Sequence, residues 1–208
     1  MGQQQADTRA QILATVRDFV QREVVPCAAQ HDLEDSYPHN LVDRIKELGL
    51  FGITIPEEYG GLGLDYTTFA MIFEEMAKGW MSITGPIGTH SILAYVLAKF
   101  GSEEQKQTWL PLLAAGDKRG ALALTEPNAG SDVAAIQTTA DRDGEEYVIN
   151  GEKWWTSGAG DPRCKVIIFM GVTNPDNPKH SRQSQILVPV DAPGVEIVRM
   201  MTVFGSDD

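Results

Sequence analysis

Two stretches of the sequence combine side chains that could do chemistry. The first is ALALTEPNAGSD, Ala121 to Asp132, an apolar run that ends abruptly in a hydroxyl, a carboxylate, a proline and a small-residue turn. Thr125 stands where the predicted strand gives way to a loop, so its hydroxyl can donate and accept hydrogen bonds outside the core. Gly130 and Ser131 favour a tight turn whose N–H groups can converge on an anion. The pattern suits a cradle for a phosphate or a polar ring edge, and it also suits an ordinary strand followed by a capped loop.

The second stretch is INGEKWWTSGAG, Ile149 to Gly160. An Asn-Gly pair between two β-type runs is the strongest short hairpin signal that a sequence carries. Asn150 and Gly151 therefore predict a hairpin turn, followed by a strand through EKWWTS.

The predicted strand would place the aromatic and hydroxyl side chains on defined faces, because residues two apart in a strand share a face. Trp155 and Ser157 would point one way, and Trp154 and Thr156 the other. One face would then present an aromatic plane beside a small hydroxyl, which suits a flat heteroaromatic ligand. Two core tryptophans at the end of a hairpin are the alternative.

The chain before these stretches has helical spacing. Apolar residues recur three and four apart in the opening segment, which predicts a helix that ends or kinks at Pro26. Further helices are expected after Pro38, over residues 66–77, over residues 82–100, and from Ser102 to near Gly116. The last of these begins with a capping box, in which Ser102 and Gln105 each satisfy the other's backbone N–H.

The spacing changes to short β-type runs after Gly120: ALAL, EEYVI, EKWWTS, KVIIFMGV and SQILVPV, separated by turn residues. The pattern predicts an α+β chain with its boundary near residue 118.

The composition excludes several classes of function. A net charge of −12, from 17 basic and 29 acidic residues, does not suit sequence-independent nucleic-acid binding. No apolar run approaches the roughly 20 residues of a membrane span. Cys27 and Cys164 form no metal-binding or disulfide pattern. The histidines form no metal-binding pair, and each is expected at the surface or at a helix end: His31, His39, His90 and His180.

Together, LTEPNAGSD and YVINGEKWWTSGA resemble the flavin-binding signature of acyl-CoA dehydrogenases. IPEEYGGLGLD, GTHSILAYVLAKFGSEEQKQTWLPLLAAGDKRGALALTEP and DAPGVEIVRMMTVFG are similar, in the same order, to segments of the family's N-terminal and middle domains. The resemblance covers essentially the whole chain. It implies an N-terminal all-α domain over residues 1–118, followed by a middle β-barrel-like domain over residues 119–208, which is incomplete.

The resemblance also implies an FAD site built from both stretches. The Thr125 hydroxyl would bond the pyrimidine edge of the isoalloxazine, Trp155 would pack against the ring system, and Ser157 would donate near flavin N5. Ser131 would also help to bind the acyl-CoA. The expected cofactor-binding residues are Leu122, Ala123, Leu124, Thr125, Ser131, Trp155, Thr156 and Ser157, and no metal is expected.

The implied reaction oxidises the Cα–Cβ bond of an acyl-CoA thioester. A glutamate base removes the α-proton while a hydride passes to flavin N5. The family pattern places that glutamate in a C-terminal domain beyond Asp208. No catalytic residue is therefore expected within this chain, and the chain alone is expected to be inactive.

The resemblance further implies partners and a location. An electron-transfer flavoprotein or a similar acceptor would take the electrons, and the complete protein would be a homodimer or homotetramer. The location would be the bacterial cytoplasm, or the mitochondrion or peroxisome of a eukaryote.

Three residues depart from the common family pattern. Leu122 stands where many members carry an aromatic residue, Thr156 replaces an aliphatic one, and Ser157 replaces threonine. These departures look closest to the branch whose eukaryotic members carry a kinase-like domain. A same-fold acyl-CoA oxidase or flavin monooxygenase is an alternative function, and so is a non-catalytic FAD- and CoA-binding remnant.

Overall fold

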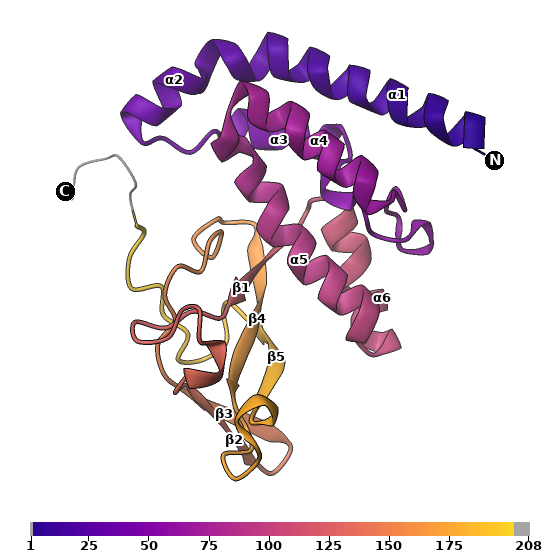
Figure 1. Cartoon of the computed structure of the whole chain (residues 1–208). Coiled ribbons are helices and arrows are strands. Elements are labelled where there is room, and N and C mark those ends of the chain that lie inside the picture. Colours follow the sequence, from indigo (N-terminus) through magenta and orange to yellow (C-terminus); the bar gives the residue numbers. More distant parts are fainter. Residues whose placement is uncertain (1, 202–208) are drawn as a thin grey trace. The chain divides into compact units, whose positions relative to one another are not determined.

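The computed structural model describes residues 2–201, with side chains from residue 7 onward. The chain forms two compact units that divide between Asp117 and Lys118. Helices build the first unit, and strands with long loops build the second (Figure 1). None of the helices in residues 2–201 combines the length and the apolar character that crossing a membrane requires.

The helical unit opens with one nearly continuous helical segment. α1 (Gly2–Phe19) runs through a π-helical turn (Val20–Val24) into α2 (Val25–Glu34), as Figure 1 shows. Pro26 lies in the first turn of α2, where the chain changes from π to α geometry. Proline has no backbone N–H to donate, and a first-turn position tolerates this. The sequence predicts that the helix ends or kinks at Pro26. The helix does not end there, and its regular α geometry is instead interrupted by the π turn just before Pro26.

The remaining helices of this unit close around an apolar core. They are α3 (His39–Glu47), α4 (Tyr66–Gly79), α5 (Gly85–Phe100) and α6 (Glu103–Ala114), with 3-10 turns at Leu50–Gly52, Glu57–Tyr59 and Met81–Thr84. The buried core draws side chains from α1, the π turn, α3, α4 and the 3-10 turns, among them Val16, Val20, Ile45, Phe51, Ile72 and Ile83. The amphipathic spacing read from the sequence is thus the spacing that buries this core.

The prediction for the start of α6 is confirmed. The Ser102 side chain accepts a hydrogen bond from the Gln105 amide at 3.2 Å, and the Gln105 side chain accepts one from the Ser102 amide at 2.9 Å. Two backbone donors of the first turn are satisfied in this way.

One histidine departs from expectation. His90 on α5 is fully buried, and its ring meets Phe51 edge-on with 5.1 Å between the ring centroids. A surface or helix-end position was therefore the wrong prediction for His90. Its spacing from Ile87 and Leu93 places it in the buried stripe of α5.

The second unit contains a mixed, open sheet. Its strands are β1 (Arg119–Ala123), β2 (Thr139–Asp143), β3 (Glu146–Asn150), β4 (Cys164–Val172) and β5 (Gln183–Pro189). β5 pairs antiparallel with β4 along one side of that strand. On its other side, β4 pairs in parallel first with β1, over Cys164–Phe169, and then with β2, at Val172. β2 continues into the β2–β3 hairpin, and the sheet does not close into a barrel.

The hairpin turn does not lie where the sequence places it. β2 and β3 are joined at Gly144, with Asp143 opposite Glu146, whereas Asn150 lies at the far end of the same ladder. Gly151 has a φ of +145°, and a Cβ there would lie 2.0 Å from the Thr138 side chain. Close approach of two backbones, rather than a hairpin, therefore requires a glycine at this position.

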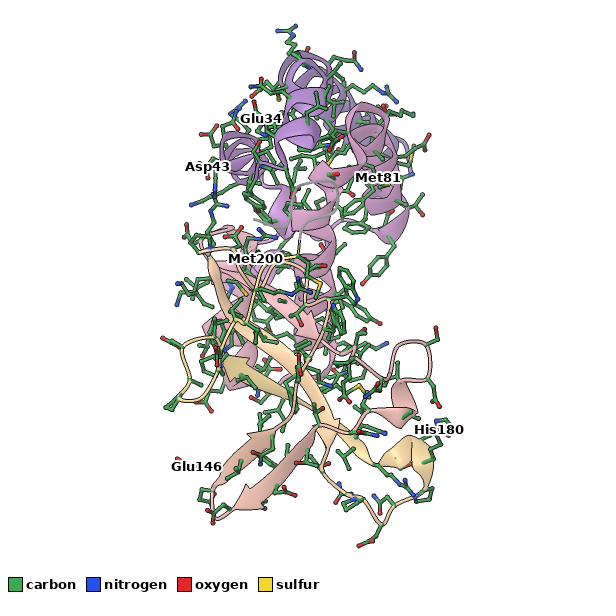
Figure 2. All side chains as sticks on the ribbon, turned by 90° about the vertical axis from the view of Figure 1, so that its left-hand side faces the viewer. Glu34, Asp43, Met81, Glu146, His180 and Met200 are labelled. Carbon is green, nitrogen blue, oxygen red and sulfur yellow. The ribbon has the colours of Figure 1, made fainter. Side chains whose placement is uncertain are left out.

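The loops of this unit reach two separate exposed points. Figure 2 labels Glu146 on the β2–β3 hairpin and His180 in the 3-10 turn Lys179–Ser181, which lie on opposite sides of this unit in that view. The polar segment before β5, residues 174–181, is exposed.

Candidate functional site

The first chemical stretch begins on β1 and leaves it at Leu124. Ala121 and Ala123 are buried, while Leu122 is half-buried on the alternate face. Leu124 and Thr125 follow the strand and are half-buried. Thr125 therefore lies at the strand-to-loop transition, as the sequence predicts.

A tight turn follows Thr125. The Glu126 amide donates to the Ala129 carbonyl at 2.9 Å, and the Ala129 amide donates to the Glu126 carbonyl at 3.1 Å. Ser131 lies beyond this turn and is exposed. Its neighbour Asp132 forms an ion pair of 2.9 Å with Lys179. Asp132 thus ties the segment after the turn to the 3-10 turn Lys179–Ser181.

Residues 151–160 of the second stretch do not form a strand, which corrects the expected alternation of faces. Trp155 has a φ of +60°, in the left-handed region that side chains rarely adopt. The Ser157 amide donates to the Trp155 carbonyl at 2.9 Å, which closes a local turn. Trp155 is 62% exposed, and Ser157 is exposed as well. Both side chains reach solvent from an irregular loop, and Thr156 between them is half-buried.

The two tryptophans do not point to opposite faces. The rings of Trp154 and Trp155 are stacked, with centroids 6.0 Å apart and planes 22° from parallel. The half-buried Trp154 thus supports the exposed indole of Trp155 from behind.

A backbone hydrogen bond joins the two stretches. The Trp154 amide donates to the Thr125 carbonyl at 2.8 Å. Thr125, Trp155 and Ser157 are therefore presented by neighbouring segments of backbone.

A buried ion pair lies beneath this junction. Lys153 Nζ donates to Glu126 Oε1 at 2.8 Å and to the Leu124 carbonyl at 3.0 Å. Glu126 also accepts from the Gln137 amide at 2.7 Å, and from the amide and hydroxyl of Thr138 at 3.1 and 2.6 Å. The pair therefore links three segments of the unit at one carboxylate.

The electrostatics of the pair follow from its burial. Burial on its own raises the pKa of Glu126, but hydrogen bonds from Lys153, Thr138 and the Gln137 amide outweigh it and hold that pKa below its ordinary value of 4.5. Burial lowers the pKa of Lys153, and the bond to Glu126 opposes that shift. The Lys153 ammonium also lies 5.2 Å from the centroid of the Phe169 ring.

A second buried ion pair lies at the other end of β1. Arg119 Nη1 pairs with Asp161 Oδ2, and both side chains are almost completely buried. Asp161 Oδ1 accepts from the Arg163 amide at 2.7 Å. Arg119 begins β1, and Asp161 ends the loop that carries Trp155 and Ser157.

Comparison with known proteins identifies the family. A family model described as "Acyl-CoA dehydrogenase, N-terminal domain" matches residues 6–117, and one described as "Acyl-CoA dehydrogenase, middle domain" matches residues 121–208. The chain belongs to the acyl-CoA dehydrogenase family.

Individual acyl-CoA dehydrogenases show the same similarity. The probable acyl-CoA dehydrogenase FadE2 of Mycobacterium tuberculosis is 45% identical over 174 residues, which cover 81% of this chain and 42% of that protein. The human mitochondrial short-chain specific acyl-CoA dehydrogenase is 39% identical over 194 residues, which cover 92% of this chain and 46% of that protein. The solved structure of the acyl-CoA dehydrogenase of Geobacillus kaustophilus is 34% identical in sequence, with a TM-score of 0.81. The match covers 90% of this chain and 49% of that one. The chain therefore spans less than half the length of these relatives.

The acyl-CoA dehydrogenase fold brings together some of the predicted site residues and separates another. Thr125, Trp155 and Ser157 lie on segments joined by the Trp154 hydrogen bond. Ser131 lies beyond the Glu126 turn and is exposed. In residues 2–201, no group of His, Cys, Asp and Glu side chains gathers in a way that could hold a metal ion.

The buried charges of this candidate site are not predicted from the sequence. Neither Glu126 nor Lys153 is among the site residues expected from the sequence. One signal was present, because each is a charged residue inside an otherwise apolar or aromatic stretch, and buried charges need partners. The sequence alone does not say which cation meets which carboxylate.

Proposed function

We propose that this chain provides the flavin-binding face, and part of the acyl-CoA-binding face, of an FAD-dependent acyl-CoA dehydrogenase. The observation that carries the proposal is the hydrogen bond between Trp154 and Thr125, which places both chemical stretches side by side. Family membership over both domains supports it.

The residues at this junction fit an isoalloxazine ring. Such a ring needs a broad apolar surface to pack on and hydrogen-bond partners along its polar edge. The exposed indole of Trp155 offers the surface, and the hydroxyls of Thr125 and Ser157 offer the partners. The full proposed cofactor set is Leu122, Ala123, Leu124, Thr125, Ser131, Trp155, Thr156 and Ser157, with Ser131 also meeting the substrate.

The chain's own residues would bind and orient rather than transfer protons. Bound FAD would supply the hydride acceptor. Trp155 would hold the ring by packing, and Ser157 would donate a hydrogen bond to its polar edge. Glu126 is a poor candidate for the proton-abstracting base, because it is buried against Lys153 and its pKa is lowered. We assign proton abstraction to no residue in the described part of the chain.

Reduction of the flavin by substrate tests the proposed activity. The complete gene product, purified with its FAD, is mixed anaerobically with acyl-CoA thioesters of increasing chain length. We expect bleaching of the flavin absorbance with at least one of them, and turnover with an artificial electron acceptor. No bleaching with any thioester would contradict the dehydrogenase assignment. Rapid reoxidation by O₂ with peroxide release would instead favour an acyl-CoA oxidase.

Several finer assignments belong to the same proposal. The electron acceptor would be an electron-transfer flavoprotein, and the complete protein would be a homodimer or homotetramer. The relatives are bacterial and mitochondrial, which supports a location in the bacterial cytoplasm, or in the mitochondrion or peroxisome of a eukaryote. The domain boundary is proposed between residues 118 and 119, and membership of the branch with a kinase-like domain also stays a prediction.

A further inference from the structure

Two buried ion pairs fasten one loop to opposite ends of β1. The loop is Lys153–Asp161, and it carries Trp155 and Ser157. We propose that these two pairs are positioning groups, which hold the loop in its cofactor-binding arrangement before the cofactor arrives. The inference rests on the proposed function for its choice of cofactor, although the fastening itself does not.

The first pair closes the loop onto the end of β1. Lys153 gives one hydrogen bond to Glu126 at 2.8 Å and one to the Leu124 carbonyl at 3.0 Å. The side chains of Lys153 and Glu126 are only 9% and 7% exposed. A single ammonium therefore bonds the two residues that flank Thr125.

The second pair closes the loop onto the start of β1. Arg119 and Asp161 are 2% and 1% exposed, and the Arg119 amide donates to the Arg163 carbonyl at 2.8 Å. The loop thus enters beside one end of the strand and leaves beside the other.

Backbone bonding would leave the middle of the loop loosely attached. The amides of Ser157, Ala159 and Asp161 donate to the carbonyls of Trp155, Thr156 and Gly158, so these bonds shape local turns without tying the loop to β1. The small Ala159 side chain packs against Ala121 and Ala123, which covers little apolar area. Beyond the Trp154–Thr125 backbone bond at its start, the loop is held by side-chain pairs at its two ends in place of the ladder bonds of an ordinary strand.

The signs of the charges fix the direction and alignment of the loop. The loop contributes a cation at Lys153 and an anion at Asp161, whereas the β1 side offers Glu126 and Arg119. A reversed loop would bring Lys153 against Arg119 and Asp161 against Glu126. Burying like charges together is very costly, so only the observed alignment satisfies both pairs.

The matched variants remove one cation at a time. Lys153→Met and Arg119→Met keep an apolar stem, and each carboxylate retains other donors: Gln137 and Thr138 for Glu126, and Arg163 for Asp161. Arg119→Lys is the conservative variant. Ile168→Ala is the control, because Ile168 is buried in β4 next to Ile167, on the face opposite the alanine cluster. This change loosens the core without touching either pair.

The first measurement needs no cofactor. Hydrogen exchange of the complete gene product, stripped of FAD, is followed in peptides covering residues 154–159, together with the thermal midpoint of each variant. We expect exchange there to accelerate about tenfold or more in both Met variants, as for a locally opened segment. Arg119→Lys should retain most of the protection. Ile168→Ala should leave exchange within about twofold of wild type at a comparable loss of thermal stability.

The second measurement is FAD affinity, by titration of the same proteins. Both Met variants should bind FAD about tenfold more weakly, because the ligand must then order the loop itself. Unchanged affinity in both Met variants would overturn the positioning role, and so would an equal loss in Ile168→Ala. A wild-type protein that takes up no FAD would overturn the proposed function instead. Faster exchange in its Met variants would still support the fastening of the loop.

Discussion

The amide of Trp154 donates a hydrogen bond of 2.8 Å to the carbonyl of Thr125. This bond joins the strand-to-loop transition after β1 to the loop that carries the exposed Trp155. The first stretch supplies the Thr125 hydroxyl but no aromatic surface, and the second supplies Trp155 and the Ser157 hydroxyl. Only their junction brings all three groups together, so substitutions in the two stretches should affect cofactor binding in distinguishable ways.

Trp155→Ala should weaken FAD binding by on the order of 1–3 kcal/mol, because the ring loses its packing surface. Its effect on folding should be small, since the indole is 62% exposed. FAD titration followed by flavin fluorescence measures the first quantity, and urea unfolding measures the second. A Trp155→Ala protein that binds FAD as tightly as wild type would contradict the assignment of this residue.

Trp154→Ala is the matched comparison for that variant. A strand would have put Trp154 on the opposite face, with an effect on stability alone. The observed stack, with centroids 6.0 Å apart, instead makes Trp154 a support for Trp155. We therefore expect Trp154→Ala to lower both stability and FAD affinity, with the larger fall in affinity still belonging to Trp155→Ala.

The backbone at Trp155 predicts an unusual order of stability. Its φ of +60° suits glycine better than any residue with a Cβ. In urea unfolding, Trp155→Gly should therefore be more stable than Trp155→Ala by about 1 kcal/mol. The same two changes at Trp154, whose φ is not positive, should give the reverse order. Equal stabilities of the two variants at Trp155 would indicate that the left-handed conformation is not kept in solution.

Ser157→Ala should remove one hydrogen bond to the flavin, roughly 1 kcal/mol of binding. Flavin reduction by acyl-CoA should slow by a larger factor, because the bond would lie at the edge of the ring that accepts the hydride. Stopped-flow absorbance gives the reduction rate, and Ser181→Ala, another exposed serine of the same unit, is the control. A loss confined to affinity would remove Ser157 from the reacting edge.

The Glu126 carboxylate predicts a pH dependence of stability. Its pKa is lower in the folded chain than its ordinary value of 4.5, so its contribution is complete above that pH. The contribution is then lost as the pH falls through the lower, folded value. Between about pH 7 and about pH 3, the free energy of unfolding of Glu126→Gln should fall less steeply than that of wild type. Glu145→Gln, at an almost fully exposed carboxylate, is the control and should follow the wild-type curve. A Glu126→Gln curve that runs parallel to the wild-type curve would refute the prediction.

The sequence predicts much of the fold because most elements are set by local signals. The capping box of Ser102 and Gln105 marks the start of α6, and apolar runs mark β1, β4 and β5. β2 escaped prediction because Thr139–Asp143 is polar and lacks an alternating pattern. The Asn150-Gly151 pair led to a wrong hairpin prediction. Gly151 is needed because Thr138 lies too close for a Cβ, and this contact joins distant parts of the chain.

The residue types of the proposed site can be read from the sequence, whereas their geometry cannot. The exposure of Trp155 follows from a left-handed backbone that periodicity does not reveal. The pairing of Lys153 with Glu126, and of Arg119 with Asp161, depends on which ends of β1 the loop meets. Such choices are made by tertiary packing, so they become visible only in the structure.

The central claim is that the junction of Thr125, Trp155 and Ser157 binds FAD, and the flavin content of the complete gene product tests it most directly. The protein is purified, its visible spectrum is recorded, and it is denatured to release any bound flavin for identification and quantification. We expect flavin absorbance bands and about one FAD per chain, with a clear loss of bound FAD in Trp155→Ala. A wild-type protein that purifies colourless and takes up no added FAD would contradict the account.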